Sequence, residues 1–470
     1  NEANIFLKEY RQVMIPANLL SIAGLKKPFE NLEHDIQRFT NSAVALRCLL
    51  ECVAAKAPNG KKLITRDDAD LLLSIMHEII RLGFVSDSIH LGIDNPKVTL
   101  LESGRIGIED TFFEKALLPF RSDNLNEEID EYLKSFESRM NTPIVEDSDL
   151  KPKTSKSLEE LNLAFLSDFG FSFEEMCLFC HSCTDLCLER ETSVLSISKS
   201  SFLKELNRLT SLSTTKIEAL LNKFSIRNRP KYLVAPDGFS NLEVFPWKYN
   251  REFSTNRRFI MRNVESEEHD TLSWGMRHST MTLQHLTYLL YEGKLTNTGQ
   301  KLTKLQGKFR ETKGKRFTQQ VRDFLSLDKR LKVTPYEVTV KPIGHLTASE
   351  NLGDIDVLVF IPDTSQVFSI ECKCTNQAKN VHEMKKEMDN YLGRGKKTGL
   401  MDKHVKRHKW LLENEPQVAM FCGASKNVKI FSVVLTSELL PTKYIGRTQL
   451  PMPLYSFYQL KQSGVELFEK

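Results

Sequence analysis

Two apolar runs joined by a turn constrain the fold of this 470-residue chain more than any other feature. The first run covers residues 355–361 and begins within Gly353-Asp354-Ile355-Asp356, whereas the second covers residues 367–370 and leads directly into Glu371-Cys372-Lys373. Residues 362–365, which read Pro-Asp-Thr-Ser, are typical of a turn. Two β-branched and aromatic runs separated by such a turn predict a β-hairpin. We therefore expect the end that carries Asp356 to lie beside the end that carries Glu371.

The hairpin would gather charged side chains at one end of a sheet. Side chains alternate along a strand, so Glu371 and Lys373 share one face, and Asp354 and Asp356 share a face of their own strand. Carboxylate oxygens are ligands that Mg²⁺ prefers, and a bound cation can activate water and neutralise charge on a phosphoryl oxygen. An ammonium group beside the carboxylates can orient the attacking water or stabilise the transition state. The alternative interpretation is a polar hairpin edge with a surface ion pair.

At Asp356, Glu371 and Lys373 the chain resembles the PD-(D/E)xK nuclease superfamily, which has the restriction-endonuclease-like fold. The resemblance covers residues 306–470 and implies that Asp356 and Glu371 bind Mg²⁺, for which Mn²⁺ can substitute. It also implies that the backbone carbonyl of Cys372 joins them and that Lys373 positions the nucleophilic water. Asp354 is a candidate for a further metal ligand or for a contact to one. The resemblance therefore implies a metal-dependent endonuclease that hydrolyses phosphodiester bonds in nucleic acid, with DNA favoured over RNA.

The elements predicted around the hairpin have the order of the superfamily's core, which is a helix, three strands, a helix and a strand. Apolar spacing predicts a helix at residues 314–325, strands at 332–340, 355–361 and 367–370, two helices at 378–392 and 401–412 in the place of the second helix, and a strand at 428–435. One position departs from the superfamily pattern. Many members carry a Glu just after the aromatic residue of the first helix, where this chain has Thr318. The difference leaves three alternatives open: a single-metal site, use of Asp354 instead, or reduced activity.

Basic residues accumulate on both sides of the hairpin. Residues 301–332 contain eleven Lys and Arg against three acidic residues, and residues 394–409 contain seven against one. A positive rim around a metal-binding centre is what a phosphate-backbone substrate needs. The alternative is that these charged helices simply face solvent. The residues expected to contact nucleic acid are Lys313, Lys315, Arg316, Lys403, His404 and Arg407.

Four of the nine cysteines have the spacing C-x2-C-x2-C-x3-C, which is that of a bacterial ferredoxin-type cluster. They are Cys177, Cys180, Cys183 and Cys187. The context favours a buried helix instead, because Ser172 and Glu175 have the spacing of an N-cap and a capping box. At about 100° per residue the four thiols fall on one helix face together with apolar residues, where cysteine behaves as a small hydrophobe. An iron–sulfur or zinc site at these cysteines is therefore disfavoured.

The composition along the chain predicts a fold of the α+β or α/β class, with a helical N-terminal two-thirds and a C-terminal αβββαβ nuclease-like domain. The predicted parts are a helical domain at residues 1–140, a linker at 141–157, a helical and irregular basic-aromatic domain at 158–305, and the nuclease-like domain at 306–470. In the third part, the Arg- and aromatic-rich connector at residues 227–258 fits packing better than contact with bases. No run approaches the roughly 20 apolar residues of a membrane span. We therefore expect no membrane contact and a cytoplasmic location, with homo-oligomers or larger complexes left open.

The sequence thus favours a Mg²⁺-dependent nuclease whose helical region serves recognition, regulation or assembly. By analogy with the superfamily, a role in genome defence or repair is expected. Two alternatives remain. One is a catalytically silent nuclease fold that binds nucleic acid or a protein partner, which the Thr318 departure motivates. The other is a redox-sensing iron–sulfur protein with an attached nuclease, which the cysteine spacing motivates.

Overall fold

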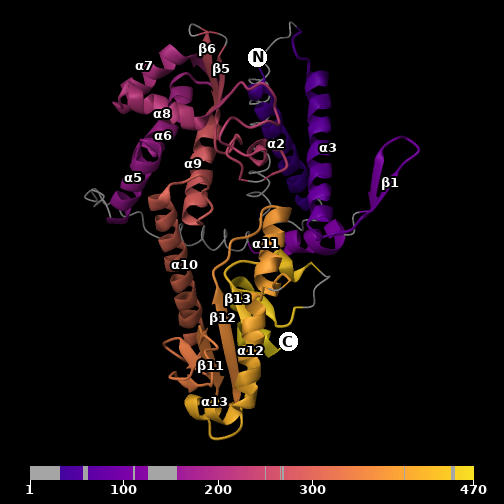
Figure 1. The fold of residues 1–470 in the computed structure, drawn as a ribbon, viewed down its shortest axis with the longest axis vertical. Helices are drawn as coiled ribbons and strands as arrows, with labels where there is room; N and C mark the ends of the chain where they lie inside the picture. The colour runs from indigo at the N-terminus through magenta and orange to yellow at the C-terminus, as the bar shows by residue number, and fades with distance from the viewer. Residues whose placement is uncertain are drawn as a thin grey trace. The chain divides into compact units, whose positions relative to one another are not determined.

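A computed structural model of the chain describes residues 32–56, 62–109, 112–124, 127, 156–248, 250–264, 266, 269–395, 397–445 and 450–469. The chain divides into two compact units, which contain the elements labelled in Figure 1. Unit 1 consists of Asn1–Val85 and Arg139–Arg310, and unit 2 consists of Ser86–Ser138 and Glu311–Lys470. Residues 141–155 of the predicted linker lie outside the described residues. Both units combine helices with small sheets, so the overall class is α+β, as predicted.

Unit 1 combines helices with a four-stranded sheet. Its strands are β3 (Val194–Ser198), β4 (Ser225–Arg227), β5 (Ile260–Val264) and β6 (Asp270–Gly275), in the order β3-β6-β5-β4. Strand β6 runs antiparallel to both of its neighbours, whereas β4 and β5 are parallel. The helices of this unit are α2 (Leu32–Ala55), α3 (Arg66–His90), α5 (Lys156–Phe169), α6 (Phe173–Glu189), α7 (Lys199–Thr210), α8 (Thr214–Phe224) and α9 (Met276–Tyr291), with a 3-10 helix η3 (Asn241–Val244). Helix α10 (Gln300–Ser326) continues the chain into unit 2.

The sheet of unit 1 corrects the prediction that residues 158–305 are helical and irregular. Its strands contain only three to six residues each, which is too few for a clear period of two. Strand β3 pairs with β6, but helices α7 and α8 and strands β4 and β5 lie between them in the sequence. No hairpin turn therefore marks this pair of strands. Short strands whose partners lie far along the chain leave little local signal.

The core of unit 1 is rich in aromatic side chains. Phe179, Phe202 and Trp274 are fully buried. The ring of Phe202 lies edge-on to the other two, with centroid separations of 6.0 Å from Phe179 and 5.4 Å from Trp274. The indole Nε1 of Trp274 donates a hydrogen bond to the carbonyl of Cys183 at 2.9 Å. This bond satisfies the polar atom that a buried tryptophan brings into a core.

The cysteine-bearing segment is helix α6, as predicted. Ser172 is its N-cap, and the side chains of Ser172 and Glu175 form both hydrogen bonds of the capping box. Three of the four cysteines on this helix are fully buried in the core, and Cys177 is half-buried. Burial raises the pKa of the Cys177 thiol to about 11, so this thiol is protonated at neutral pH. The prediction of a capped helix with buried cysteines is confirmed.

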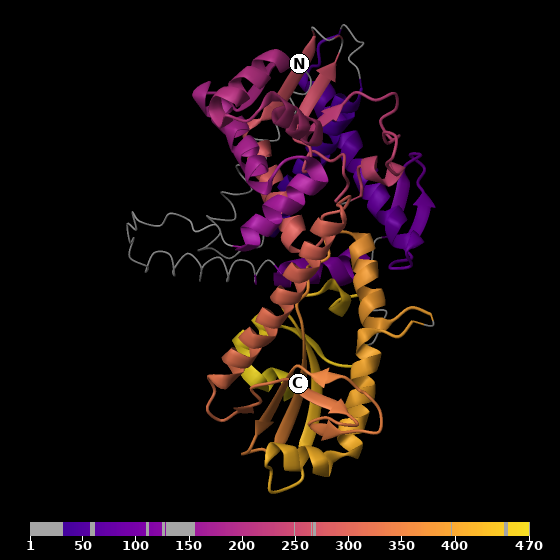
Figure 2. The ribbon, with the colours of Figure 1, turned by 60° about the vertical axis from the view of Figure 1, so that its left-hand side comes forward.

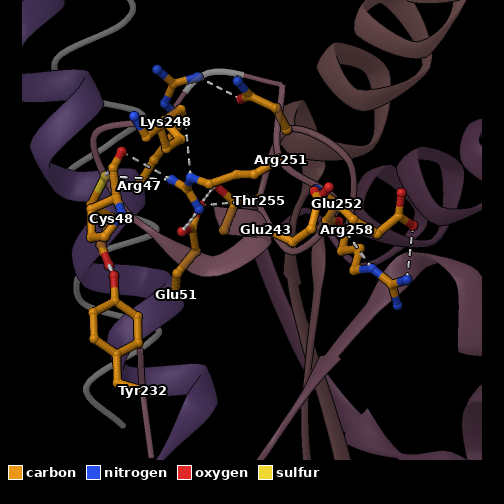
Figure 3. A network of polar contacts seen from close by, with 12 residues as sticks. Arg47, Cys48, Glu51, Tyr232, Glu243, Lys248, Arg251, Glu252, Thr255 and Arg258 are labelled. Atoms are coloured by element: carbon orange, nitrogen blue, oxygen red, sulfur yellow. Dashed lines mark hydrogen bonds and ion pairs between the residues drawn. The ribbon is translucent and has the colours of Figure 1, made fainter. Parts of the chain in front are cut away.

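Buried ion pairs join α2 to the basic connector of unit 1 (Figure 3). Arg251 is ion-paired with Glu51, and both side chains are buried. Beside this pair, the buried carboxylate of Glu252 lies 2.7–2.9 Å from three cationic side chains, those of Lys223, Arg257 and Arg258. Arg251, Arg257 and Arg258 of the connector therefore serve packing, which agrees with the interpretation favoured from the sequence.

Unit 2 is built on a five-stranded sheet. Its strands are β7 (Lys332–Val333), β11 (Val357–Ile361), β12 (Gln366–Lys373), β13 (Lys429–Thr436) and β14 (Leu454–Ser456), in the order β14-β13-β12-β11-β7. Strands β11 and β12 form the predicted antiparallel hairpin, in which Val357 is opposite Ile370. Strand β13 runs parallel to both β12 and β14. The hairpin prediction is confirmed.

Helices cover both faces of this sheet (Figure 2). Alternating residues of β11 point to opposite faces, so Val359 packs in a cluster with Val321 of α10, whereas Phe360 packs in a cluster with Leu411. The helices that follow the hairpin are α11 (Val381–Leu392), α12 (Leu400–Glu413), α13 (Glu415–Cys422) and α14 (Phe457–Ser463), with 3-10 helices η4 (Pro441–Lys443) and η5 (Gly464–Glu469). Burial on both faces explains why β11 reads as a continuous apolar run.

Two smaller sheets complete unit 2. Strands β8 (Val338–Lys341), β9 (Leu346–Thr347) and β10 (Asp354–Ile355) form a sheet in the order β10-β8-β9. Strands β1 (Lys97–Leu100) and β2 (Ile106–Glu109) form a separate hairpin, which the π-helix η2 (Phe113–Leu117) follows. Among the described residues of either unit, no helix has the length and apolar character that a bilayer crossing needs.

Candidate active site

The hairpin of unit 2 brings Asp356 to the end of strand β12. Asp356 lies between β10 and β11, and its Oδ2 accepts a hydrogen bond from the backbone amide of Cys372 at 2.7 Å. Glu371 and Lys373 flank that amide in the chain, and their side chains form an ion pair. The structure thus gathers Asp356, Glu371 and Lys373, as the sequence predicted.

Glu371 is the most strongly held carboxylate of this group. Its side chain is 8 % exposed, and Oε2 accepts a hydrogen bond from Arg407 Nη2 at 2.6 Å. The Nδ1 of His404 lies 3.4 Å from the same oxygen, and Lys373 pairs with Oε1. Burial by itself would raise the pKa of Glu371, but the positive charges of Lys373 and Arg407, with the hydrogen bond from Lys373, outweigh burial and lower the pKa below its ordinary value. Glu371 is therefore ionised at neutral pH.

His404 and Arg407, which the sequence assigned to nucleic-acid contact, are buried beside Glu371 on helix α12. Arg407 Nη2 lies 2.6 Å from His404 Nδ1, and the guanidinium can only donate, so this nitrogen accepts. The imidazole is then neutral, and burial lowers the pKa of His404 to about 4, with further help from the charge of Arg407. Arg407 Nη1 also donates to the carbonyl of Asp354. Arg407 thus supports the carboxylate and His404 packs beside it, so neither residue forms a basic rim.

Asp356 has the opposite electrostatic environment. Burial, followed by the negative charge of Glu371, raises the pKa of Asp356 to about 7. The charge of Lys373 and the amide of Cys372 offset only part of this effect. Two nearby carboxylates with pKa values pushed apart are a pattern found at functional sites.

The donor set of this site fits a divalent cation of the Mg²⁺ type. Mg²⁺ is usually held by one or two carboxylates together with water and substrate oxygens, and Asp356 with Glu371 supplies two. A bound cation would offset both causes of the raised pKa of Asp356, the burial of the carboxylate and then its repulsion from Glu371. The side chain of Asp354 is exposed, and no group of three His, Cys, Asp or Glu side chains suited to a metal ion occurs in the part of the chain that the structure describes.

Comparison with known protein families matches most of the chain to one family. The model of a family described as anti-phage protein Upx-like matches residues 21–451, which is most of the chain. This chain belongs to the Upx-like family. No curated protein and no solved structure matches it. The family match includes the hairpin with Asp356 and Glu371, but the family's description names no chemical activity.

In this Upx-like chain, helix α10 contacts the site from the face of the five-stranded sheet on which Val359 packs with Val321. Thr318, which stands where many nucleases of the resembled superfamily have Glu, is buried on α10. One turn further along, Arg322 Nη2 donates to the backbone carbonyl of Asp356 at 2.9 Å. Arg322 was not singled out from the sequence, because one Arg in a basic helix gives no signal of its own.

The remaining residues predicted for nucleic-acid contact lie on the surfaces of α10 and α12. Lys315, Arg316 and Lys403 are exposed, and Lys315 is ion-paired with Glu311. Lys313 Nζ donates to Asn376 Oδ1 at 3.3 Å. A hollow of unit 2 has a volume of about 370 Å³ and is lined by Lys443 and residues 450–455. None of the site residues belongs to this lining.

Proposed function

We propose that this chain is a metal-dependent nuclease that acts on nucleic acid, with DNA favoured, in defence against phage. The observation that carries the proposal is the hydrogen bond that fixes Asp356 against the end of β12, beside the Glu371–Lys373 ion pair. Membership of the Upx-like anti-phage family supports the defence role. The resemblance of these three residues to the PD-(D/E)xK pattern supports the reaction.

In this proposal each side chain has a role that its contacts support. Mg²⁺ bound by Asp356 and Glu371, with the carbonyl of Cys372, would lower the pKa of a water ligand and neutralise charge on the phosphoryl group. Arg407 keeps Glu371 ionised and fixes its orientation. Lys373 carries a positive charge, because the attraction of Glu371 outweighs the effect of burial on its pKa. Its ammonium group can therefore donate a hydrogen bond to the attacking water or to a phosphate oxygen.

The decisive experiment measures cleavage of plasmid, linear duplex DNA, single-stranded DNA and RNA with Mg²⁺ or Mn²⁺. We expect metal-dependent cleavage by the native chain and its loss in Asp356→Ala and Lys373→Ala. The matched control is Asp363→Ala, which removes an exposed carboxylate from the turn of the same hairpin. Cleavage that survives both site substitutions would show that the active site lies elsewhere.

A second candidate function is a catalytically silent module that binds nucleic acid or a protein partner. Two observations favour it: Arg407 and Lys373 already pair with both oxygens of Glu371, and Thr318 replaces an acidic residue. The positive charges of Arg407 and Lys373 could then take the place of a metal ion. Calorimetric titration with Mg²⁺ and Mn²⁺ separates the candidates, because the silent module predicts no heat of metal binding at this site.

A further inference from the structure

Two arginines lie opposite each other in the sheet of unit 1. Strands β4 and β5 are parallel neighbours, and their register pairs Arg227 with Arg262. Like charges directly opposite each other on adjacent strands destabilise a sheet. Negative charge near the pair, from the protein or from a ligand, offsets this repulsion.

A small cavity lies at these two arginines, with a volume of about 130 Å³. Its lining contains three cationic side chains and one carboxylate, together with one amide and one aliphatic side chain. The lining residues are Lys199, Glu218, Leu221, Asn222, Arg227 and Arg262. The cavity therefore carries a net positive charge within one compact unit.

Arg262 is the fixed member of the cluster. It is 8 % exposed, and Asp270 receives hydrogen bonds from its Nε at 2.9 Å and from its Nη2 at 2.5 Å. Its other terminal nitrogen, Nη1, lies 3.4 Å from Asn222 Oδ1. A guanidinium held in this way presents its remaining donors without losing further conformational entropy.

Arg227 is the exposed arginine of the cluster. Its Nη2 donates to Asn222 Oδ1, the same amide oxygen that Arg262 approaches. Among the described residues, no carboxylate lies within ion-pair distance of Arg227, whereas Lys199 is paired with Glu218 at 2.7 Å. Partial burial and the positive charge of Arg262 lower the pKa of Arg227, and the negative charge of Asp270 opposes them. The cavity thus contains two guanidinium groups that share one neutral acceptor.

We propose that this cavity binds a single phosphate group through Arg227, Arg262 and Lys199. Guanidinium groups form paired, charge-assisted hydrogen bonds with phosphate oxygens, and a dianion would compensate the cross-strand repulsion. The volume equals that of roughly four water molecules, which suits one phosphate group with little accompanying structure. Leu221 is the only apolar residue of the lining, so the cavity offers no recess for a base. The phosphate belongs either to a free nucleotide or phosphate ester, or to a nucleic-acid backbone or end.

This site is separate from the β11–β12 hairpin, and the proposal does not depend on nuclease activity. The test is calorimetric titration of the full chain, in metal-free buffer, with inorganic phosphate, adenosine monophosphate and a short single-stranded DNA with a 5′-phosphate. We expect saturable binding of inorganic phosphate. A nucleotide that binds as tightly as the oligonucleotide indicates a free ester, and much tighter binding of the oligonucleotide indicates a nucleic-acid source. Both outcomes support the phosphate site.

The variants are chosen so that folding does not obscure the result. Arg227→Gln retains a side-chain amide donor and removes the charge that forms no ion pair among the described residues, so phosphate affinity should fall about tenfold or more. Arg227→Lys should restore part of that affinity, since it restores charge but not paired donation. The matched control is Arg208→Gln, which removes an exposed, ion-paired arginine from α7 and should leave affinity unchanged. Arg262→Gln is avoided, because it would leave Asp270 buried without its partner.

Two results would overturn the proposal. One is the absence of phosphate binding by a native chain that thermal unfolding shows to be folded. The other is equal phosphate affinity in Arg227→Gln and Arg208→Gln, which would mean that the measured binding occurs away from the cavity.

Discussion

Replacing Asp356 by Asn should stabilise the folded chain at pH 8 in metal-free buffer. Folding moves the pKa of this carboxyl from 3.8 to about 7, chiefly through burial and then through the charge of Glu371. At 1.36 kcal/mol per pKa unit, ionised Asp356 would cost the folded state roughly 4 kcal/mol above pH 7. Solvent screens part of this cost because the side chain is only partly buried, so we expect a gain of about 1–3 kcal/mol for the variant. The amide oxygen of Asn can still accept the hydrogen bond from Cys372.

The pH dependence of this gain follows from the direction of the shift. Because the folded-state pKa of Asp356 is raised, the folded state binds a proton more tightly than the unfolded chain does, and its stability falls as pH rises. The gain of Asp356→Asn over the native chain should therefore be near zero below about pH 4, grow between pH 4 and 7, and level off above pH 7. Urea unfolding of both chains at pH 4, 6 and 8 measures this difference. A variant that is less stable at pH 8, or a difference that does not change with pH, would refute the reasoning.

Three further predictions concern the metal, the cysteine helix and the buried ion pair. Mg²⁺ affinity, measured by calorimetry, should rise about tenfold per pH unit up to about pH 7 and then level off, because a proton must leave Asp356. Cys183→Ser should cost about 1–3 kcal/mol of unfolding free energy, since it places a hydroxyl in the core, whereas half-buried Cys177→Ser should cost less than about 1 kcal/mol. If all four cysteines bound an iron–sulfur cluster, the two variants should instead lose similar amounts of unfolding free energy, and both should lose bound iron. Arg251→Met should cost about 3–5 kcal/mol because it strands the buried carboxylate of Glu51, and adding Glu51→Gln should recover part of that loss in a double-mutant cycle.

The hairpin could be predicted because its signals are local and agree with one another. Two apolar runs with a turn of four residues leave one simple pairing, and burial of β11 on both faces makes its run continuous. The approach of Asp356 to the end of β12 follows from that register alone. The capped helix α6 was predictable for the same reason, since Ser172 and Glu175 stand three residues apart at its start.

Helix α12 shows what local reasoning missed. Its basic residues suggested a helix surface that contacts nucleic acid, yet four of its residues are buried: Met401, His404, Arg407 and Leu411. Their spacing of three or four residues is that of a single helix face. Two polar side chains within an otherwise apolar stripe were therefore the signal, because a buried His or Arg needs a partner in the core. The identity of that partner, Glu371, depends on tertiary packing that the helix sequence does not contain.

The two carboxylates of the hairpin differ because their neighbours differ. Arg407 and Lys373 pair with the two oxygens of Glu371 and keep it ionised, so its orientation needs no metal. The buried carboxylate of Asp356 accepts one hydrogen bond, from the backbone amide of Cys372, and lies beside the negative charge of Glu371. Its ionisation therefore costs free energy unless a cation is bound. Groups whose environments push their pKa values apart take different roles in a site. In the proposed nuclease, Glu371 would be the pre-oriented ligand, and Asp356 would be the ligand whose ionisation couples metal binding to pH.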